Sequence, residues 1–424
     1  MAYLKFGDKI IKYGNSILNS GESFVLKSTA KTFPEEINDN NNGIILLEFS
    51  TPEIVTINYG DGTIINYTAS FISAGRYQLF LRKKGANTSA TNINLYTYAD
   101  GLSLPRVVSF SFDRSKLILI FIELQKLAVG DLLFEITKYP SLKKFTIDQL
   151  YAIVGLNLEG SFSSSVVETV QINNAFHSTS PYYKTIPSSF FLMPLKTLGV
   201  GSSGMGNSFA SSKFDQIYLL AATLNYLKIQ GTPITDNHFG MGSLPANFNL
   251  LVNLTRFELI GTSHTIIPDV LNNIPSINNL FVGYTSLLTS WGDISSLINL
   301  KVLTINNSPN LSVTLPAYFS NFVNLKSMMA TGVLRTQLRV DTWVDNWYTF
   351  ITTNAAMTGA NTLPFRGMNH NIANTIIGDS TASPAGTYQQ PTGYIQGVNN
   401  GTPASPKEKI WVMVNQYGHN WTTL

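Results

Sequence analysis

The stretch LKVLTINNSPNLSVTLPAYF, from Leu300 to Phe319, decides the fold of this 424-residue chain. It starts with apolar residues in the order L-x-x-L-x-I, at Leu300, Leu303 and Ile305, which is typical of a strand with one buried face. A hydroxyl side chain, Ser308, follows three residues later, and an L-P-x-x-F segment closes the stretch. Because proline cannot donate to a strand ladder, this closing segment predicts an irregular or 3₁₀ return arm.

The apolar pattern occurs nine times, at intervals of 23 to 30 residues, when Val, Ile, Phe, Met and Ala are also accepted. The copies begin at Leu117, Leu142, Val167, Leu195, Leu224, Leu254, Ile277, Leu300 and Leu325. One such coil cannot bury its own apolar face, so the copies must stack to form a continuous core. The recurrence therefore predicts a solenoid with a parallel sheet.

Two other features recur with the strands. The hydroxyl position is filled by Ser203, Thr232, Thr262, Thr285 and Ser308, and the prolines of the return arms are Pro187, Pro245, Pro268 and Pro316. A buried column of hydroxyls would satisfy backbone groups where each strand leaves the sheet. Residues 104–335 resemble the leucine-rich-repeat family. The resemblance implies a solenoid of about nine coils, here with a Ser/Thr ladder.

Alternation assigns the third and fifth positions of each copy to the open, concave face of the sheet. Since parallel strands lie about 4.8 Å apart, six of these residues should form one mixed patch: Tyr226, Lys228, Arg256, Glu258, Asn279 and Phe281. Tyrosine and arginine are common at binding hot spots, and aromatic faces suit sugar rings. The alternative is an ordinary sheet surface on which Lys228 and Glu258 form a weak ion pair.

A different pattern precedes the repeats, at residues 22–103. Residues 54–67 read as a strand, a turn at Gly60-Asp61-Gly62 and a second strand, and residues 74–81 supply another strand. The stretches I-N-Y-G-D-G-T and A-G-R-Y-Q-L resemble the PKD-like immunoglobulin-type β-sandwich, which is the fold that they imply. Asp61 could bind calcium in this turn, although a hairpin turn needs no ion.

Residues 336–424 are expected to close the end of the solenoid. One face of a helix would carry Val340, Trp343, Val344, Trp347, Phe350 and Ile351, with Asp341 placed to cap its N-terminus. The remaining tail is rich in Gly, Pro, Asn and Thr until residues 410–414, an apolar run long enough for a terminal strand. Such a strand could pair between chains in a homotrimer, although a solenoid can also act as a monomer.

Both ends of the chain resemble structural proteins of crAss-like phages that infect Bacteroidetes hosts. The matching segments are K-F-G-D-K-I at residues 5–10, P-F-R-G-M at 364–368, G-T-Y-x-x-P-T-G-Y-x-x-G at 386–397 and S-P-x-E-x-I-W-V…N-Q-Y-G at 405–418. The resemblance implies a head or tail fibre-type protein, assembled in the host cytoplasm and carried on the virion. Residues 1–21 would dock on the particle, and the partners would be other virion proteins and a host surface glycan or protein.

The composition narrows the function further. Charged residues make up 12% of the chain and the net charge is +3, which gives no basic footprint for nucleic acid. The absence of cysteine removes disulfides and thiolate sites. The sequence shows neither a secretory signal nor a membrane span. We therefore expect no nucleic acid, no membrane insertion and no cofactor.

Residues suited to catalysis are few and scattered. A glycosidase needs two carboxylates about 5–10 Å apart, whereas the acids of the repeats are interpreted as single: Glu123, Asp148, Glu168, Glu258 and Asp293. Glu35-Glu36 belongs to a loop-like run. The histidines show no metal-ligand spacing and are interpreted as polar loop residues: His177, His238, His264, His370 and His419. The sequence predicts neither a catalytic residue nor a metal site.

Together these observations predict a mainly β fold with some α, built from a sandwich, a solenoid and a helical cap. The leading hypothesis is a non-catalytic virion protein, a fibre or fibre-associated subunit that binds a host receptor or neighbouring subunits through the repeat face. The first alternative is a bacterial cell-surface leucine-rich-repeat adhesin, which would need an export signal. The second is a capsular-polysaccharide depolymerase, which would need an acid pair.

Overall fold

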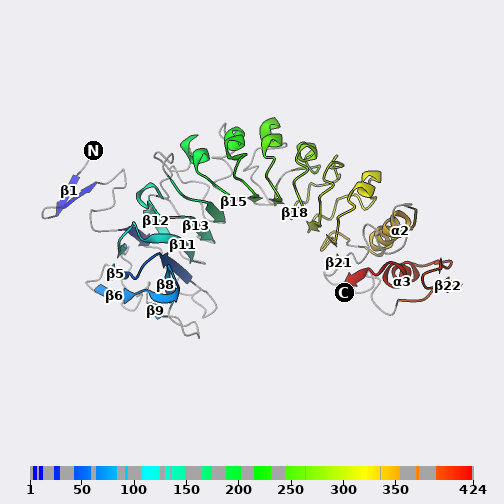
Figure 1. Cartoon of the computed structure of the whole chain (residues 1–424), viewed down its shortest axis with the longest axis horizontal. Coiled ribbons are helices and arrows are strands. Elements are labelled where there is room, and N and C mark those ends of the chain that lie inside the picture. Colours follow the sequence, from blue (N-terminus) through cyan, green and yellow to red (C-terminus); the bar gives the residue numbers. More distant parts are fainter. Residues whose placement is uncertain are drawn as a thin grey trace. The chain divides into compact units, whose positions relative to one another are not determined.

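The computed structural model describes residues 3–6, 9–12, 23–28, 43–58, 64–83, 91–93, 107–124, 129–133, 136–148, 165–173, 188–201, 214–230, 244–262, 264–334, 336–353, 369–371 and 388–422. The chain divides into two compact units, Met1–Leu224 (unit 1) and Asn225–Leu424 (unit 2). The described residues are mostly β-structure with two α-helices, both in unit 2 (Figure 1). The expectation of a mainly β chain with some α is confirmed.

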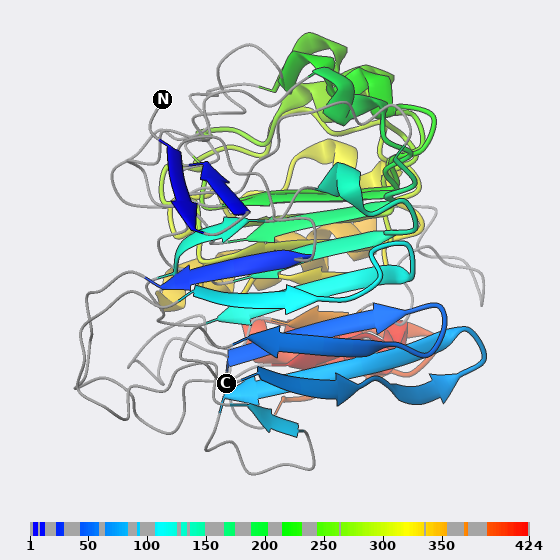
Figure 2. The ribbon, with the colours of Figure 1, turned by 90° about the vertical axis from the view of Figure 1, so that its left-hand side faces the viewer.

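The larger sheet of unit 1 joins antiparallel strands to parallel ones (Figure 2). Its strands, in spatial order, are β7 (Ser70–Ser73), β8 (Arg76–Lys83), β4 (Gly43–Phe49), β11 (Leu117–Leu124), β13 (Lys144–Asp148), β14 (Thr169–Asn173) and β15 (Thr197–Gly201), and β9 (Thr91–Ile93) also pairs with β8. β11 is antiparallel to β4 and parallel to β13. The outer edge of the first repeat strand is therefore paired with a strand that precedes the repeats.

The second sheet of unit 1 is antiparallel. Its order is β12 (Val129–Leu133), β3 (Phe24–Ser28), β10 (Val107–Ser111), β5 (Ile54–Asn58) and β6 (Ile64–Thr68). β5 and β6 pair antiparallel, as the predicted hairpin requires, whereas the turn with Asp61 lies outside the described residues. A separate hairpin joins β1 (Tyr3–Phe6) and β2 (Lys9–Lys12).

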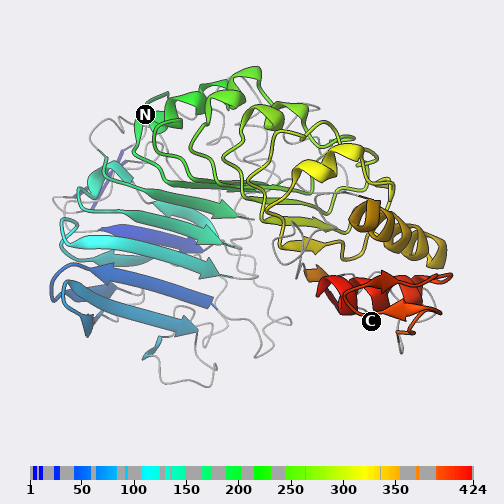
Figure 3. The same cartoon turned by 45° about the vertical axis from the view of Figure 1, so that its right-hand side comes forward.

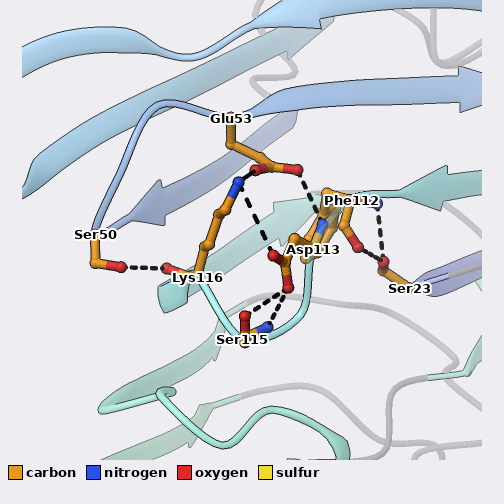
Figure 4. A network of polar contacts seen from close by, with 7 residues as sticks. All are labelled: Ser23, Ser50, Glu53, Phe112, Asp113, Ser115 and Lys116. Atoms are coloured by element: carbon orange, nitrogen blue, oxygen red, sulfur yellow. Dashed lines mark hydrogen bonds and ion pairs between the residues drawn. The ribbon is translucent and has the colours of Figure 1, made fainter.

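A polar network fixes the loop that carries the chain from the second sheet to β11 (Figure 4). The Glu53 carboxylate accepts from the Lys116 ammonium at 2.7 Å and from the backbone N–H of Asp113 at 2.9 Å. The Ser23 hydroxyl donates to the Phe112 carbonyl at 2.8 Å. The Phe112 ring also packs edge-on against Phe49 of β4, at 5.3 Å between centroids. The loop thus links the two sheets by both polar and aromatic contacts.

Unit 2 is built on a parallel sheet (Figure 3). Its order is β16 (Tyr226–Gln230), β17 (Arg256–Ile260), β18 (Asn279–Gly283), β19 (Val302–Asn306), β20 (Ser327–Met329), β21 (Asn369–Asn371) and β24 (Asn420–Thr422). The repeat pattern predicted the first five of these strands but not β21 and β24. A short hairpin, β22 (Tyr394–Ile395) and β23 (Asn399–Asn400), precedes the final helix.

The predicted apolar triplets form the inner face of both sheets. All members of the nine triplets are buried, and the register aligns Phe257, Leu280 and Leu303 on successive strands. The third and fifth positions point to the other side, which we call the open face. The alternation predicted from the sequence is therefore confirmed.

The return arms carry the predicted 3₁₀ segments, on the side of each coil away from the strands (Figure 3). In unit 2 these are η5 (Ala246–Leu250), η6 (Asp269–Asn273) and η7 (Ala317–Asn321), each directly after its proline. Unit 1 has η1 (Ile136–Lys138), η3 (Ser188–Leu192) and η4 (Phe214–Leu220). Pro187 lies outside the described residues.

The predicted hydrogen bonds from ladder hydroxyls to the backbone are confirmed at two of the three positions that the structure describes. The Thr285 hydroxyl donates to the Gly283 carbonyl at 3.1 Å, and the Ser308 hydroxyl donates to the Asn306 carbonyl at 3.2 Å. Thr262, Thr285 and Ser308 are all buried. Ser203 and Thr232 lie outside the described residues. At Thr262 the hydroxyl lies instead 2.9 Å from Nδ1 of the His264 ring.

Replacing a ladder hydroxyl should cost a measurable part of the stability. For Ser308→Ala we expect a loss of about 1 kcal/mol, since the Asn306 carbonyl loses its buried donor. Urea unfolding measures this loss, and the exposed Ser286 of the preceding coil offers Ser286→Ala as a matched control. Equal unfolding midpoints for the two variants would contradict a structural role for the ladder.

The predicted helix is α2 (Gln337–Thr353), and Trp343 and Trp347 are among its buried residues. The capping role predicted for Asp341 is wrong, because the helix begins one turn earlier. The backbone N–H of Arg339 donates to the Thr336 hydroxyl at 3.3 Å, which places Thr336 at the N-terminus. The Arg339 guanidinium donates to the Leu311 carbonyl at 2.5 Å, which ties the start of the helix to a preceding coil.

The strand predicted at residues 410–414 is also wrong, because these residues belong to α3 (Pro406–Tyr417). Ser405 and Glu408 form a capping box, and Gly418 ends the helix with a left-handed backbone at φ 68°. These helix signals outweigh the strand preference of the apolar run. The Lys409 ammonium contacts the Asp345 carboxylate of α2 at 2.7 Å, which joins the two helices (Figure 3).

Among the residues that the structure describes, no helix combines the length and the apolar character that crossing a membrane requires.

Candidate functional site

The six residues predicted to form a patch lie on three neighbouring strands of unit 2. The register pairs Tyr226 with Arg256 and Arg256 with Asn279 in one row. It pairs Lys228 with Glu258 and Glu258 with Phe281 in the next row. Alternation directs both rows to the open face. We call Tyr226, Lys228, Arg256, Glu258, Asn279 and Phe281 the unit 2 patch.

The Arg256 guanidinium organises this patch. It lies over the Tyr226 ring, 4.6 Å from the ring centroid. Its Nε and Nη2 donate to Oε1 of Glu258 at 2.8 and 2.5 Å. Arg256 is therefore held between an aromatic face and a carboxylate, which keeps its position well defined.

The electrostatics of the patch follow from this packing. The Glu258 side chain is only 9% exposed, whereas that of Arg256 is 50% exposed. Burial, together with the neighbouring charge of Glu258, raises the pKa of Tyr226 well above its usual value, so the phenol stays neutral. The patch thus offers an aromatic ring, a phenol and a half-exposed guanidinium whose charge is balanced.

The ion pair expected between Lys228 and Glu258 is wrong, because Glu258 has a different partner. Within the described residues, Glu258 pairs with Arg256. Arg256 and Glu258 are two residues apart on β17, so their side chains share one face of the strand. The planar guanidinium also matches a carboxylate better than an ammonium does.

A second polar cluster, on the open face of unit 1, was not predicted. The Arg76 guanidinium donates to both carboxylate oxygens of Glu48, at 2.7 and 2.9 Å, and the Gln78 amide donates at 2.6 Å. The hydrogen bonds from Arg76 hold the pKa of Glu48 below its usual value, against the effect of burial. One signal was readable: Glu48 is an acid inside the apolar strand G-I-I-L-L-E-F.

The acids of the repeats lie on different elements. The parallel register of β11 and β13 makes Glu123 and Asp148 paired backbone positions. Elsewhere, Glu168 pairs with the Lys196 ammonium at 3.0 Å, and Asp293 accepts from the backbone N–H of Ser295 at 3.0 Å. Glu35-Glu36 lies outside the described residues.

Three histidines that were expected to be polar loop residues are buried instead: His264, His370 and His419 are at most 2% exposed. His370 takes the inward position that Met328 has on β20. Its Nε2 lies 2.9 Å from Nδ1 of His419, and its ring stacks on Trp421 at 4.0 Å between centroids. Over the described ranges, no three His, Cys, Asp or Glu side chains gather in a metal-binding group. His177 and His238 lie outside these ranges.

Neither a family model nor a curated protein matches this chain.

Proposed function

We propose that the chain is a leucine-rich-repeat-like solenoid of about nine coils with a PKD-like β-sandwich on its N-terminal side. The parallel strands, the proline-started 3₁₀ return arms and the Ser/Thr ladder support the repeat assignment. The β5–β6 hairpin and the contact between the Phe49 and Phe112 rings support the sandwich.

In this proposal the protein is a non-catalytic virion component, a fibre or fibre-associated subunit of a phage that infects Bacteroidetes hosts. It binds a host surface glycan or protein, or neighbouring virion subunits, through the open face of the repeats. The sequence resemblance of residues 5–10 and 364–418 supports the virion assignment. Mass spectrometry of purified virions separates it from the adhesin alternative, which requires the protein on the bacterial surface.

The single observation that carries the binding role is the organisation of the unit 2 patch. An aromatic ring and an arginine fixed against each other lose little conformational freedom on binding, which is the property of binding hot spots. Arg256 is half exposed and already oriented by Tyr226 and Glu258. The patch is therefore preorganised for binding.

The double variant Tyr226→Ala/Arg256→Ala tests this role. We expect adsorption to host cells to fall about thirtyfold, since losing hot-spot residues costs about 2 kcal/mol or more. Labelled protein and flow cytometry measure the adsorption. Leu250→Ala/Val252→Ala is the matched control, because both side chains are exposed on a return arm. Unchanged adsorption by the folded patch variant would show that the unit 2 patch does not bind the host surface.

A further inference from the structure

The open face of unit 1 carries a cluster with the same central pair as the unit 2 patch. In unit 1 the Glu48 side chain is 5% exposed and that of Arg76 is 51% exposed. In unit 2 the corresponding values for Glu258 and Arg256 are 9% and 50%. Both faces thus present a half-exposed guanidinium oriented by a buried carboxylate.

An apolar row lies beside this pair. The register sets Glu48 of β4 opposite Gln78 of β8 and Leu119 of β11. Two residues along the same strands, Leu46 lies opposite Phe80 and Phe121. All three are partly exposed, and alternation directs them to the same face as Glu48. We call Leu46, Glu48, Arg76, Gln78, Phe80 and Phe121 the unit 1 cluster.

The charges of the cluster cancel. The Glu48 carboxylate is matched by the Arg76 guanidinium, and the additional charge that acts on Glu48 is Lys144, at an exposed position of β13. A polyanion such as a nucleic acid binds where cations are unpaired, so this pair is a poor site for one. A flat apolar protein surface would displace the water that hydrogen-bonds to Arg76 and would offer no hydrogen bonds in its place. Such a partner is therefore also disfavoured.

We propose that the unit 1 cluster is a subsite for a neutral glycan. A sugar ring offers hydroxyls that donate and accept along one edge and an apolar C–H face. The hydroxyls would bond to Arg76 and Gln78, while the C–H face would pack on Phe121. This inference rests on the proposed binding function and gives it a second site and a ligand class.

An array of neutral and acidic oligosaccharides, probed with the full chain, tests the ligand class. We expect binding to neutral oligosaccharides, weakened about tenfold by Arg76→Gln and by Phe121→Ala, since each removes one side of the contact. Lys138→Gln is the matched control, because Lys138 is an exposed cation of η1 in the same unit. Thermal unfolding verifies that each variant is folded.

Hydrogen exchange with the best-bound neutral oligosaccharide locates the site. We expect added protection of β4, β8 and β11 in the unchanged chain and none in Arg76→Gln. Binding of acidic oligosaccharides alone, or no binding at all, overturns the proposal, and so does protection confined to other strands.

The two proposals can fail separately. If Tyr226→Ala/Arg256→Ala loses host-cell adsorption while Arg76→Gln and Phe121→Ala keep both adsorption and oligosaccharide binding, the unit 1 subsite is wrong and the proposed function stands. If the unit 1 variants alone lose both, the subsite stands and the unit 2 patch is wrong. If every variant keeps full adsorption and full oligosaccharide binding, both are wrong.

Discussion

Trp347→Ala should lower the free energy of unfolding of unit 2 by about 3–5 kcal/mol. The Trp347 side chain of α2 is fully buried. Its ring meets Phe319 of the last return arm edge-on at 6.1 Å and His370 of β21 at 5.1 Å. Truncation would leave a cavity between the helix, a coil and a strand, which neighbouring aromatic side chains cannot readily fill.

Intrinsic fluorescence gives a direct measurement, because all five tryptophans of the chain lie in unit 2: Trp291, Trp343, Trp347, Trp411 and Trp421. Urea unfolding followed by fluorescence and by circular dichroism yields the change. Leu338→Ala is the matched control, since Leu338 is on the same helix but 75% exposed, and we expect a loss below about 0.5 kcal/mol. If both variants unfold at the same urea concentration, α2 does not close the core.

Acid should destabilise unit 2 well before its carboxylates titrate. Burial lowers the pKa of His264 to about 4. Burial also holds the pKa of His370 and of His419 far below the usual value, and for His370 the neighbouring His419 adds to the effect. In the unfolded chain each imidazole returns to about 6.5. As the pH falls, the unfolded state therefore binds protons that the folded state does not bind, and acid favours unfolding.

Stability is thus complete above pH 7 and is lost as the pH falls below 6.5. At pH 5 each of the three histidines costs about 2 kcal/mol. Urea unfolding at pH 7.5, 6 and 5 measures the slope. His370→Leu places an apolar residue at this inward position. In this variant we expect about one third of the acid sensitivity to disappear. An unchanged slope in this variant would contradict the burial of a neutral His370.

The sequence alone predicted the structure correctly where the position of a residue within the repeat decides whether its side chain is buried. The spacing of apolar anchors such as Leu300, Leu303 and Ile305 determines which side chains enter the core, and all of them are buried. The six residues of the unit 2 patch followed from the same alternation. Proline before η5, η6 and η7 predicted these three return arms.

The sequence was insufficient where a polar residue occupies an apolar position. β21 and β24 were missed because their inward residues are His370 and Trp421, which complete the core by stacking on each other. The unit 1 cluster was missed because it depends on β4 meeting both β8 and β11, and these pairings join segments far apart in the chain. For α3 the apolar run is compatible with either a strand or a helix, and the capping residues Ser405 and Glu408 ahead of it favour the helix.

The two-sided pairing of β11 bears on how the chain folds during synthesis. β4 and β8 precede the repeats in the sequence and pair with each other, so they can form an edge before the repeats are made. β11 adds to that edge, and β13, β14 and β15 follow in sequence order. From β13 onward each new strand thus meets a partner that already exists, which keeps the entropy cost of these closing loops small. The early strands act as a template from which the sheet grows in the direction of translation.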